Sequence, residues 1–66
     1  MELTRQVAIL LVEDHELMRF GVKSLLKTVE NAIVVGETDN GPEAIQLAEK
    51  LKPDFVLMDL KLNNSD

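Results

Sequence analysis

Three short and wholly apolar segments constrain the fold of this chain more than any other feature. They span Val7–Val12, Ala32–Gly36 and Phe55–Met58. The first is too short to form a helix of its own and lacks polar/apolar alternation, which is typical of a central parallel strand buried on both faces. The other two segments are also predicted to be strands. Because parallel neighbours need a crossover of about a dozen residues or more, usually a helix, the segments between them are expected to be helical.

The segment after the first strand has the apolar spacing of an amphipathic helix. Its apolar stripe comprises Met18, Val22, Leu25, Leu26 and Val29, and its solvated side carries Arg19, Lys23 and Lys27. Such a stripe faces the core of a globular protein. Asp14 is the expected N-cap, since its short acidic side chain can accept a hydrogen bond from the first turn.

A second helix is expected to begin at Pro42, which suits the first helical position, with Gly41 or Asn40 before it. Its buried stripe is predicted to comprise Ala44, Ile45, Ala48 and Leu51. Pro53 ends this helix because its ring pushes Lys52 out of the α region.

The resulting order β-α-β-α-β places the chain in the α/β class. Nearly all crossovers between parallel strands are right-handed, so two arrangements remain. In one, the sheet order is 2-1-3 with one helix on each face. In the other, a singly wound 1-2-3 sheet buries the second strand most. Glu37 and Thr38 make the second strand the most polar at its end, which favours the 2-1-3 order of half a flavodoxin-like fold, with the first and third strands as neighbours.

The composition restricts the domain organisation and the partners. A chain of 66 residues forms one small domain at most, and a domain of this size buries only about 60% of its unfolded surface. Without cysteine there is no disulfide and no thiolate metal site. Twelve acidic against seven basic residues give a net charge of −5, which argues against direct binding to nucleic acid or an anionic membrane. No apolar run approaches the ~18 residues of a membrane span, so a cytoplasmic location is expected.

Acidic residues directly follow two of the apolar strands. Glu13 and Asp14 come after the first strand, and Asp59 comes after the third. If these strands are neighbours, the carboxylates meet at the carboxyl edge of the sheet, where ligands bind in open α/β folds. Converging carboxylates repel one another unless a cation lies among them, and oxygen ligands suit Mg²⁺ or Mn²⁺ rather than Zn²⁺. A reactive carboxylate beside such an ion can form an aspartyl phosphate.

Each of these acidic residues, taken alone, is more often a solvated helix cap than part of a site. Their pairing at the ends of two neighbouring strands is what favours a site. His15 is the only histidine, and we interpret it as a loop or first-turn residue rather than as a metal ligand or phosphocarrier.

Three motifs resemble those of the amino-terminal half of a response-regulator receiver domain. They are ILLVEDH at Ile9–His15, DNGPEA at Asp39–Ala44 and PDFVLMDL at Pro53–Leu60. The likeness covers essentially the whole chain. The spacing from the acid pair, Glu13 and Asp14, to Asp59 is also that of the family. The Glu-Asp-His run and Met18–Val22 are most similar to the subclass whose receivers precede a helix-turn-helix DNA-binding domain.

This resemblance implies a signalling domain of a two-component system rather than an enzyme. Asp59 would be the phosphoacceptor, receiving a phosphoryl group from a histidine kinase to control a transcriptional output. Glu13 and Asp14 would hold Mg²⁺, with Asp14 the more direct ligand, together with Asp59 and the backbone carbonyl of Lys61.

Two departures from the family pattern weaken the expected activity. Asn63 stands where the family usually has proline, and the chain ends at Asp66, before the family's fourth and fifth strands and the Thr/Ser and Lys that bind the phosphoryl oxygens. We therefore expect residues 1–66 to be a truncated receiver domain with no output domain, weak Mg²⁺ binding and weak or no phosphorylation.

In the 2-1-3 order the third strand lies at the side of the sheet with no neighbour beyond it, and this supports a second hypothesis. Phe55–Met58 contains no charge or proline that would protect this edge. We expect a homodimer in which a second copy covers it, most simply with the two third strands antiparallel, and exchange of elements between copies is the competing arrangement. On this alternative the chain acts only as a self-assembling structural or folding module. A small hydrolase with an aspartyl intermediate would need a lysine and a lid that the chain does not supply.

Overall fold

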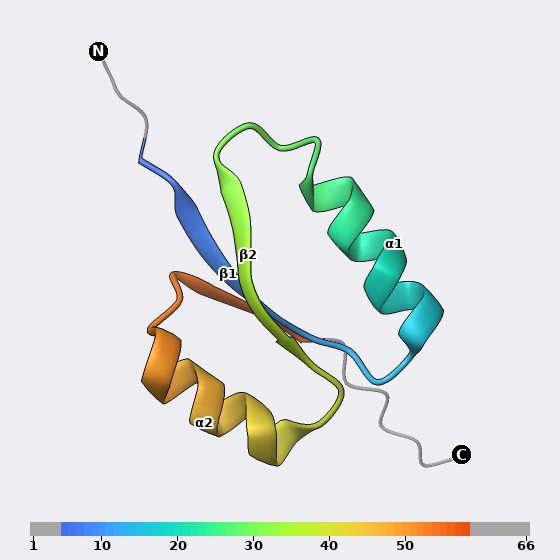
Figure 1. Cartoon of the computed structure of the whole chain (residues 1–66), viewed down its shortest axis with the longest axis vertical. Helices are drawn as coiled ribbons and strands as arrows, with labels where there is room; N and C mark the ends of the chain where they lie inside the picture. The colour runs from blue at the N-terminus through green and yellow to red at the C-terminus, as the bar shows by residue number, and fades with distance from the viewer. Residues whose placement is uncertain (1–4, 59–66) are drawn as a thin grey trace.

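The computed structural model describes residues 5–58. The chain forms β1 (Val7–Val12), α1 (Glu16–Leu26), β2 (Ala32–Thr38), α2 (Gly41–Leu51) and β3 (Phe55–Met58). The three strands make one parallel sheet in the order β2-β1-β3, flanked by the two helices (Figure 1). The predicted α/β class, the β-α-β-α-β order and the 2-1-3 sheet of a flavodoxin-like half are confirmed.

Alternate residues of β1 face the two helices. Leu10 and Val12 form the buried core with Ala44 of α2. Because successive side chains of a strand point to opposite faces, Leu11 lies on the other face, where it lines a hollow together with Val22 of α1. Each helix therefore covers one face of the sheet.

Gly36 lets α2 approach the sheet closely. A Cβ atom at this position would lie 2.7 Å from Cδ1 of Leu51 and 3.3 Å from Cδ1 of Leu10. The register of β1 against β2 also shifts here, between Ile9 and Leu10. A side chain at position 36 would therefore force the Leu51 side chain, or α2 itself, to move away from the sheet.

α1 begins one residue later than predicted. His15 occupies the N-cap position and its side chain makes no capping hydrogen bond, so the prediction that Asp14 is the N-cap is wrong. The reason is that the backbone oxygen of His15 accepts the first helical hydrogen bond, from the N–H of Arg19 at 2.8 Å. Of the apolar stripe, Val22 and Leu26 are half-buried, and the other members stay exposed.

α2 starts at Gly41, one residue before the predicted start, with Asn40 as its N-cap. The Asn40 side chain accepts a hydrogen bond from the backbone N–H of Glu43 at 2.8 Å. The other end of α2 is as predicted, because Lys52 takes a left-handed φ of 50° immediately before Pro53.

The buried stripe of α2 differs from the prediction at one position. Ile45 is 65% exposed, so its assignment to the stripe is wrong, and Leu47 packs against the core instead. Positions 44, 47, 48 and 51 have the i, i+3, i+4, i+7 spacing of one helix face, whereas position 45 lies about 100° around the helix from position 44.

β2 extends to Thr38, beyond the predicted end at Gly36. The backbone N–H of Glu13 donates to the backbone oxygen of Thr38 at 3.0 Å, so the pairing continues past the end of β1. Thr38 is consequently buried despite its polar side chain.

The two helices that the structure describes are short. Each has 11 residues, and neither combines the length and the apolar character that crossing a membrane requires.

Candidate functional site

The carboxyl ends of β1 and β3 lie side by side, at the end of the sheet where both strands finish. The register places Val12 opposite Met58, and Glu13 directly follows Val12, so the acid pair leaves the sheet where β3 also ends (Figure 1). The other predicted site residues, Asp59 and Lys61, lie outside the described residues, and their roles stay predictions.

Glu13 is buried although it carries a carboxylate, with only 3% of the residue exposed. Its Oε2 accepts a hydrogen bond from the backbone N–H of His15 at 3.0 Å. Its backbone oxygen accepts from Nη1 of Arg19 at 2.9 Å. Among residues 5–58 the carboxylate has this single donor, so most of its lone pairs are available to water or a cation, the partners that buried carboxylates need.

Asp14 and His15 lie exposed beside Glu13. The three side chains each offer a possible ligand atom, and these atoms all lie within 4.8 Å of one another. The structure thus brings the predicted ligands Glu13 and Asp14 together and adds His15, which follows them at the N-cap of α1. Two carboxylates, one buried and one open to solvent, are an oxygen donor set that suits a hydrated hard cation.

The residues Thr38–Pro42 at the end of β2 have the composition of a turn, but the hydrogen bonds that Thr38 makes there were not foreseen from the sequence. Oγ1 of the buried Thr38 donates to Oε1 of Glu43 and accepts from the backbone N–H of Asn40 at 3.3 Å. The spacing Asn40-x-x-Glu43, which is typical of a capping box, could have indicated it. Since Thr38 also accepts the N–H of Glu13, this turn and the acid pair lie at the same edge of the sheet.

Two basic residues of α1 form ion pairs with β2. Nε of Arg19 lies 3.2 Å from Oε1 of Glu37, and Nζ of Lys23 lies 2.7 Å from Oε2 of the same carboxylate. The prediction that Arg19 belongs to a solvated side is therefore wrong. Lys23 keeps part of its side chain in solvent while it pairs with Glu37, and Lys27 is exposed as predicted. The hydrogen bond from Lys23, supported by the charges of Lys23 and Arg19, holds the pKa of Glu37 below its ordinary value of 4.5, although partial burial opposes the shift.

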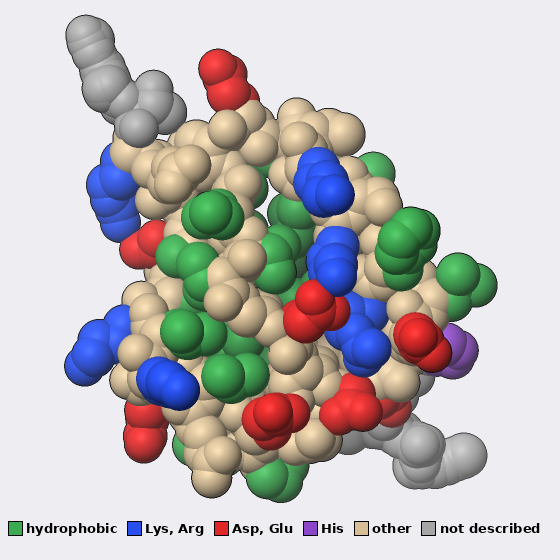
Figure 2. All heavy atoms as spheres, viewed as in Figure 1, with side chains coloured by type: hydrophobic (Ala, Val, Ile, Leu, Met, Phe, Trp, Pro, Cys, Tyr) green, Lys and Arg blue, Asp and Glu red, His purple; other side chains and the backbone are tan. Residues whose placement is uncertain are grey.

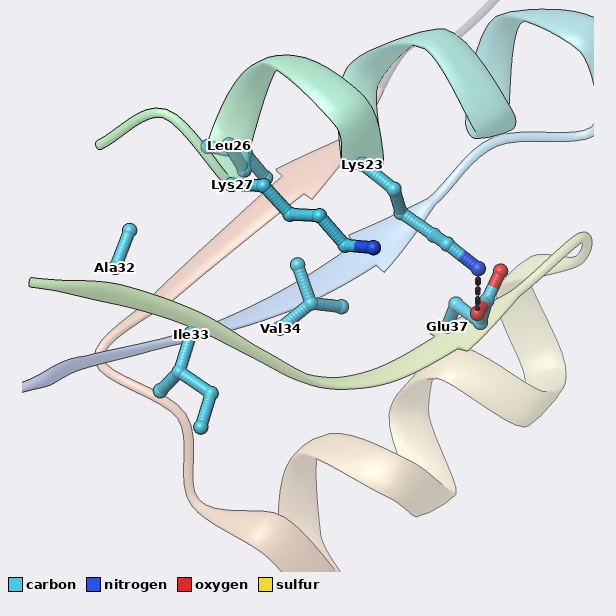
Figure 3. A pocket seen from close by; sticks show the side chains of 7 residues that line it. All are labelled: Lys23, Leu26, Lys27, Ala32, Ile33, Val34 and Glu37. Carbon is cyan, nitrogen blue, oxygen red and sulfur yellow. Dashed lines mark hydrogen bonds and ion pairs between the residues drawn. The ribbon is translucent and has the colours of Figure 1, made fainter. Parts of the chain in front are cut away.

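A hollow of about 400 Å³ lies between α1 and β2. It is lined by Lys23, Leu26, Lys27, Ala32, Ile33, Val34 and Glu37 (Figure 3). Acidic and basic side chains gather along the junction of α1 with the sheet (Figure 2). This hollow is separate from the acid pair, because Glu13 instead lines a smaller hollow of about 200 Å³ together with Val12 and Met58.

Comparisons with known proteins agree with this arrangement. Residues 9–66 match the family described as response regulator receiver domain. The response regulator proteins VraR of Staphylococcus epidermidis and Staphylococcus aureus are each 47% identical to the chain over 60 residues. The protein of the same name from Staphylococcus saprophyticus is 45% identical over 60 residues.

Each of these alignments covers 91% of the chain and 29% of the relative. The chain therefore spans less than a third of the length of the curated relatives that it matches. The family match, by contrast, extends over nearly all of the chain and includes both described acidic residues of the candidate site. The chain belongs to the response regulator receiver domain family.

Proposed function

We propose that this chain accepts a phosphoryl group on Asp59 in a Mg²⁺-dependent reaction, and we assign residues 1–66 to the receiver domain that does so. The observation that carries the proposal is the level pairing of Val12 with Met58. Acidic residues directly follow both, Glu13 and Asp14 after Val12 and Asp59 after Met58. Adjacent parallel strands deliver the residues that follow them to one edge of a sheet, which is where open α/β folds bind ligands.

Glu13 and Asp14 are the described residues that would hold the ion, with Asp59 and the backbone carbonyl of Lys61 completing the ligand set. The described residues fit this role because they offer carboxylate oxygens, and because the buried Glu13 carboxylate has one hydrogen-bond donor among residues 5–58. When bound, Mg²⁺ supplies positive charge that offsets the charge of the phosphoryl oxygens.

In the proposed reaction a carboxylate oxygen of Asp59 attacks the phosphorus of a phosphorylated histidine. The P–N bond breaks as the P–O bond forms, and the imidazole that leaves takes up a proton. The chain is then the acceptor in a reaction with a partner and is not itself an enzyme.

The partner that we propose is a histidine kinase, and the place is the cytoplasm. For the whole protein we propose control of transcription through a helix-turn-helix DNA-binding output domain. Two findings support this view: the relatives are named response regulators, and the chain spans 29% of their length. The net charge of −5 argues that these 66 residues do not bind nucleic acid directly.

Incubation with acetyl phosphate and Mg²⁺, followed by intact-mass spectrometry, tests the proposal. We expect a slow gain of one phosphoryl group that hydroxylamine removes and that does not appear without Mg²⁺. Asp59→Asn should abolish the gain, and Glu49→Gln, a change of an exposed acid on α2, should leave it intact. A label that persists in Asp59→Asn, or one that forms equally well without Mg²⁺, contradicts the proposal.

A second candidate function rests on the exposure of β3. This strand lies at one edge of the sheet, and its four residues are between 41% and 61% exposed. An unpaired strand edge is a template for another strand, and Phe55–Met58 contains no charge that would repel a copy of itself. In this alternative the chain self-assembles into a dimer through antiparallel pairing of two β3 strands, with exchange of elements between copies as the competing arrangement.

A further inference from the structure

The Arg19 side chain joins the acid pair to β2. Its Nη1 donates to the backbone oxygen of Glu13 at 2.9 Å, and its Nε lies 3.2 Å from Oε1 of Glu37. The side chain is only 22% exposed. A guanidinium group presents several donors in a fixed plane, so it can hold a carbonyl and a carboxylate at the same time, which an ammonium group on a flexible stem does less well.

The contact with the Glu13 carbonyl bears directly on Asp14. The carbonyl of Glu13 and the N–H of Asp14 belong to one planar peptide unit, so a hydrogen bond to that carbonyl fixes the direction in which Asp14 leaves β1. The rest of Glu13 is held from two other sides, through its N–H by Thr38 at 3.0 Å and through its carboxylate by the N–H of His15 at 3.0 Å.

Lys23 is a natural comparison for Arg19. It carries the same charge, lies one helical turn further along α1 and binds the other oxygen of the same Glu37 carboxylate at 2.7 Å. Within residues 5–58 its amine makes no hydrogen bond to the acid pair. Of the two basic residues, only Arg19 contacts the Glu13 carbonyl among residues 5–58.

We propose that Arg19 is a positioning residue, which orients the Glu13–Asp14 peptide by tying its carbonyl to Glu37 of β2. The part of this inference that concerns Mg²⁺ rests on the proposed function. The part that concerns the loop Glu13–His15, between β1 and α1, does not. Because Arg19 connects the loop to the contact of α1 with β2, ion binding and the packing of α1 stabilise each other reciprocally.

Amide hydrogen exchange of the metal-free chain tests the positioning role without any ion. Arg19→Gln should raise the exchange rate of the His15 N–H several-fold and shift the carbonyl ¹³C resonance of Glu13. Lys23→Gln should change neither, although it also removes an ion pair with Glu37. Arg19→Lys should behave like Arg19→Gln, since lysine keeps the charge but lacks the planar guanidinium group that donates to two acceptors at once. Equal effects of Arg19→Gln and Lys23→Gln, or no effect of either, overturn the inference.

Titration with MgCl₂, followed by the amide resonances of Glu13–His15, gives the second readout. We expect Arg19→Gln to weaken Mg²⁺ affinity roughly tenfold, the size typical of residues that orient metal ligands, and Lys23→Gln to leave it within about twofold. Removing a positive charge near a cation site by itself strengthens cation binding. A weaker affinity in Arg19→Gln is therefore opposite in sign to the electrostatic effect and reports orientation.

The two readouts separate the two proposals. If the unaltered chain shows no Mg²⁺-dependent shifts at Glu13–His15, the proposed function fails, and the metal-free exchange rates still decide whether Arg19 positions the loop. If Mg²⁺ binds but Arg19→Gln alters neither the affinity nor the exchange rates, the proposed function stands and the positioning role is wrong.

Discussion

Val12 of β1 lies directly opposite Met58 of β3, at the carboxyl ends of two parallel strands. The pairing is in register over all four residues of β3, so no bulge displaces one strand end from the other. Glu13, the residue after Val12, is buried, while Asp14 is exposed. A site at this edge therefore has one carboxylate held within the protein and one that can reach solvent.

Asp14→Asn should weaken Mg²⁺ binding roughly tenfold, equivalent to about 1.4 kcal/mol, because the amide removes the negative charge of the exposed ligand. The measurement is the MgCl₂ dependence of the amide resonances of Glu13–His15. Glu16→Gln, which alters an exposed acid just beyond the cluster, is the matched control and should have little effect. Equal affinities of Asp14→Asn and the unaltered chain would remove Asp14 from the ligand set.

Gly36→Ala should destabilise the fold by about 1–3 kcal/mol, the usual cost of an overpacked contact. The added Cβ would lie 2.7 Å from Cδ1 of Leu51, so α2 or the Leu51 side chain must move. Gly21→Ala is the control, because a Cβ there meets nothing within 4 Å, and alanine in a helix interior gains up to about 1 kcal/mol over glycine. In urea unfolding, the free energy of unfolding should fall in Gly36→Ala and rise in Gly21→Ala, relative to the unaltered chain. A rise in both variants would contradict the close approach of α2 to Gly36.

The stability of the chain should fall in acid because two carboxylates have lowered pKa values when folded. The pKa of Glu37 is held below its ordinary value of 4.5 by the hydrogen bond from Lys23, and that of Asp54 below 3.8 by the backbone N–H of Ala8 and then by Arg5. A lowered folded pKa stabilises the fold fully above the unfolded value, and this contribution is lost as the pH falls through the folded value.

Urea unfolding free energies measured from neutral pH down to a pH of about 3 check this expectation. In Glu37→Gln the unfolding free energy should fall less steeply as the pH is lowered, because the variant lacks a group whose pKa differs between the folded and unfolded states. Glu49→Gln, at an exposed position without an ion pair among the described residues, should leave the slope unchanged. Identical slopes for the two variants would argue against the role of Glu37.

If β3 pairs with a second copy, the chain should sediment as a dimer at high micromolar concentration. Val56→Lys should shift it to monomer, because a charge on an edge strand opposes pairing. Leu17→Lys is the control, since Leu17 is also exposed and apolar, at 78%, but lies on α1. A well-folded monomer of the unaltered chain at that concentration would exclude both the dimer and the exchange of elements.

The local sequence pattern alone was sufficient to predict the strands and helices and their order along the chain. Apolar runs without alternation mark the three strands, and the 3.6-residue period marks the two helices, because both signals depend on residues close together in the chain. Pro53 likewise forces Lys52 out of the helix through contact between neighbouring residues. The acid pair was found for the same reason, since it directly follows a recognisable strand.

Hydrogen bonds between distant segments decided the rest. The extension of β2 to Thr38 depends on the N–H of Glu13, 25 positions earlier in the chain, finding that carbonyl. Leu47 replaces Ile45 in the core because the face that α2 presents is set by its packing on the sheet. Arg19 looked like a residue of a solvated face and instead bonds both Glu13 and Glu37.

The alternation of strands and helices, and the carboxylates after the first strand, can be read from the chain without its fold. The burial of Glu13, the place of His15 rather than Asp14 at the N-cap position, and the link that Arg19 makes between the acid pair and β2 appear only in the folded molecule. Strand and helix propensities are local, whereas burial and hydrogen-bond partners depend on the register and packing of segments brought together by folding.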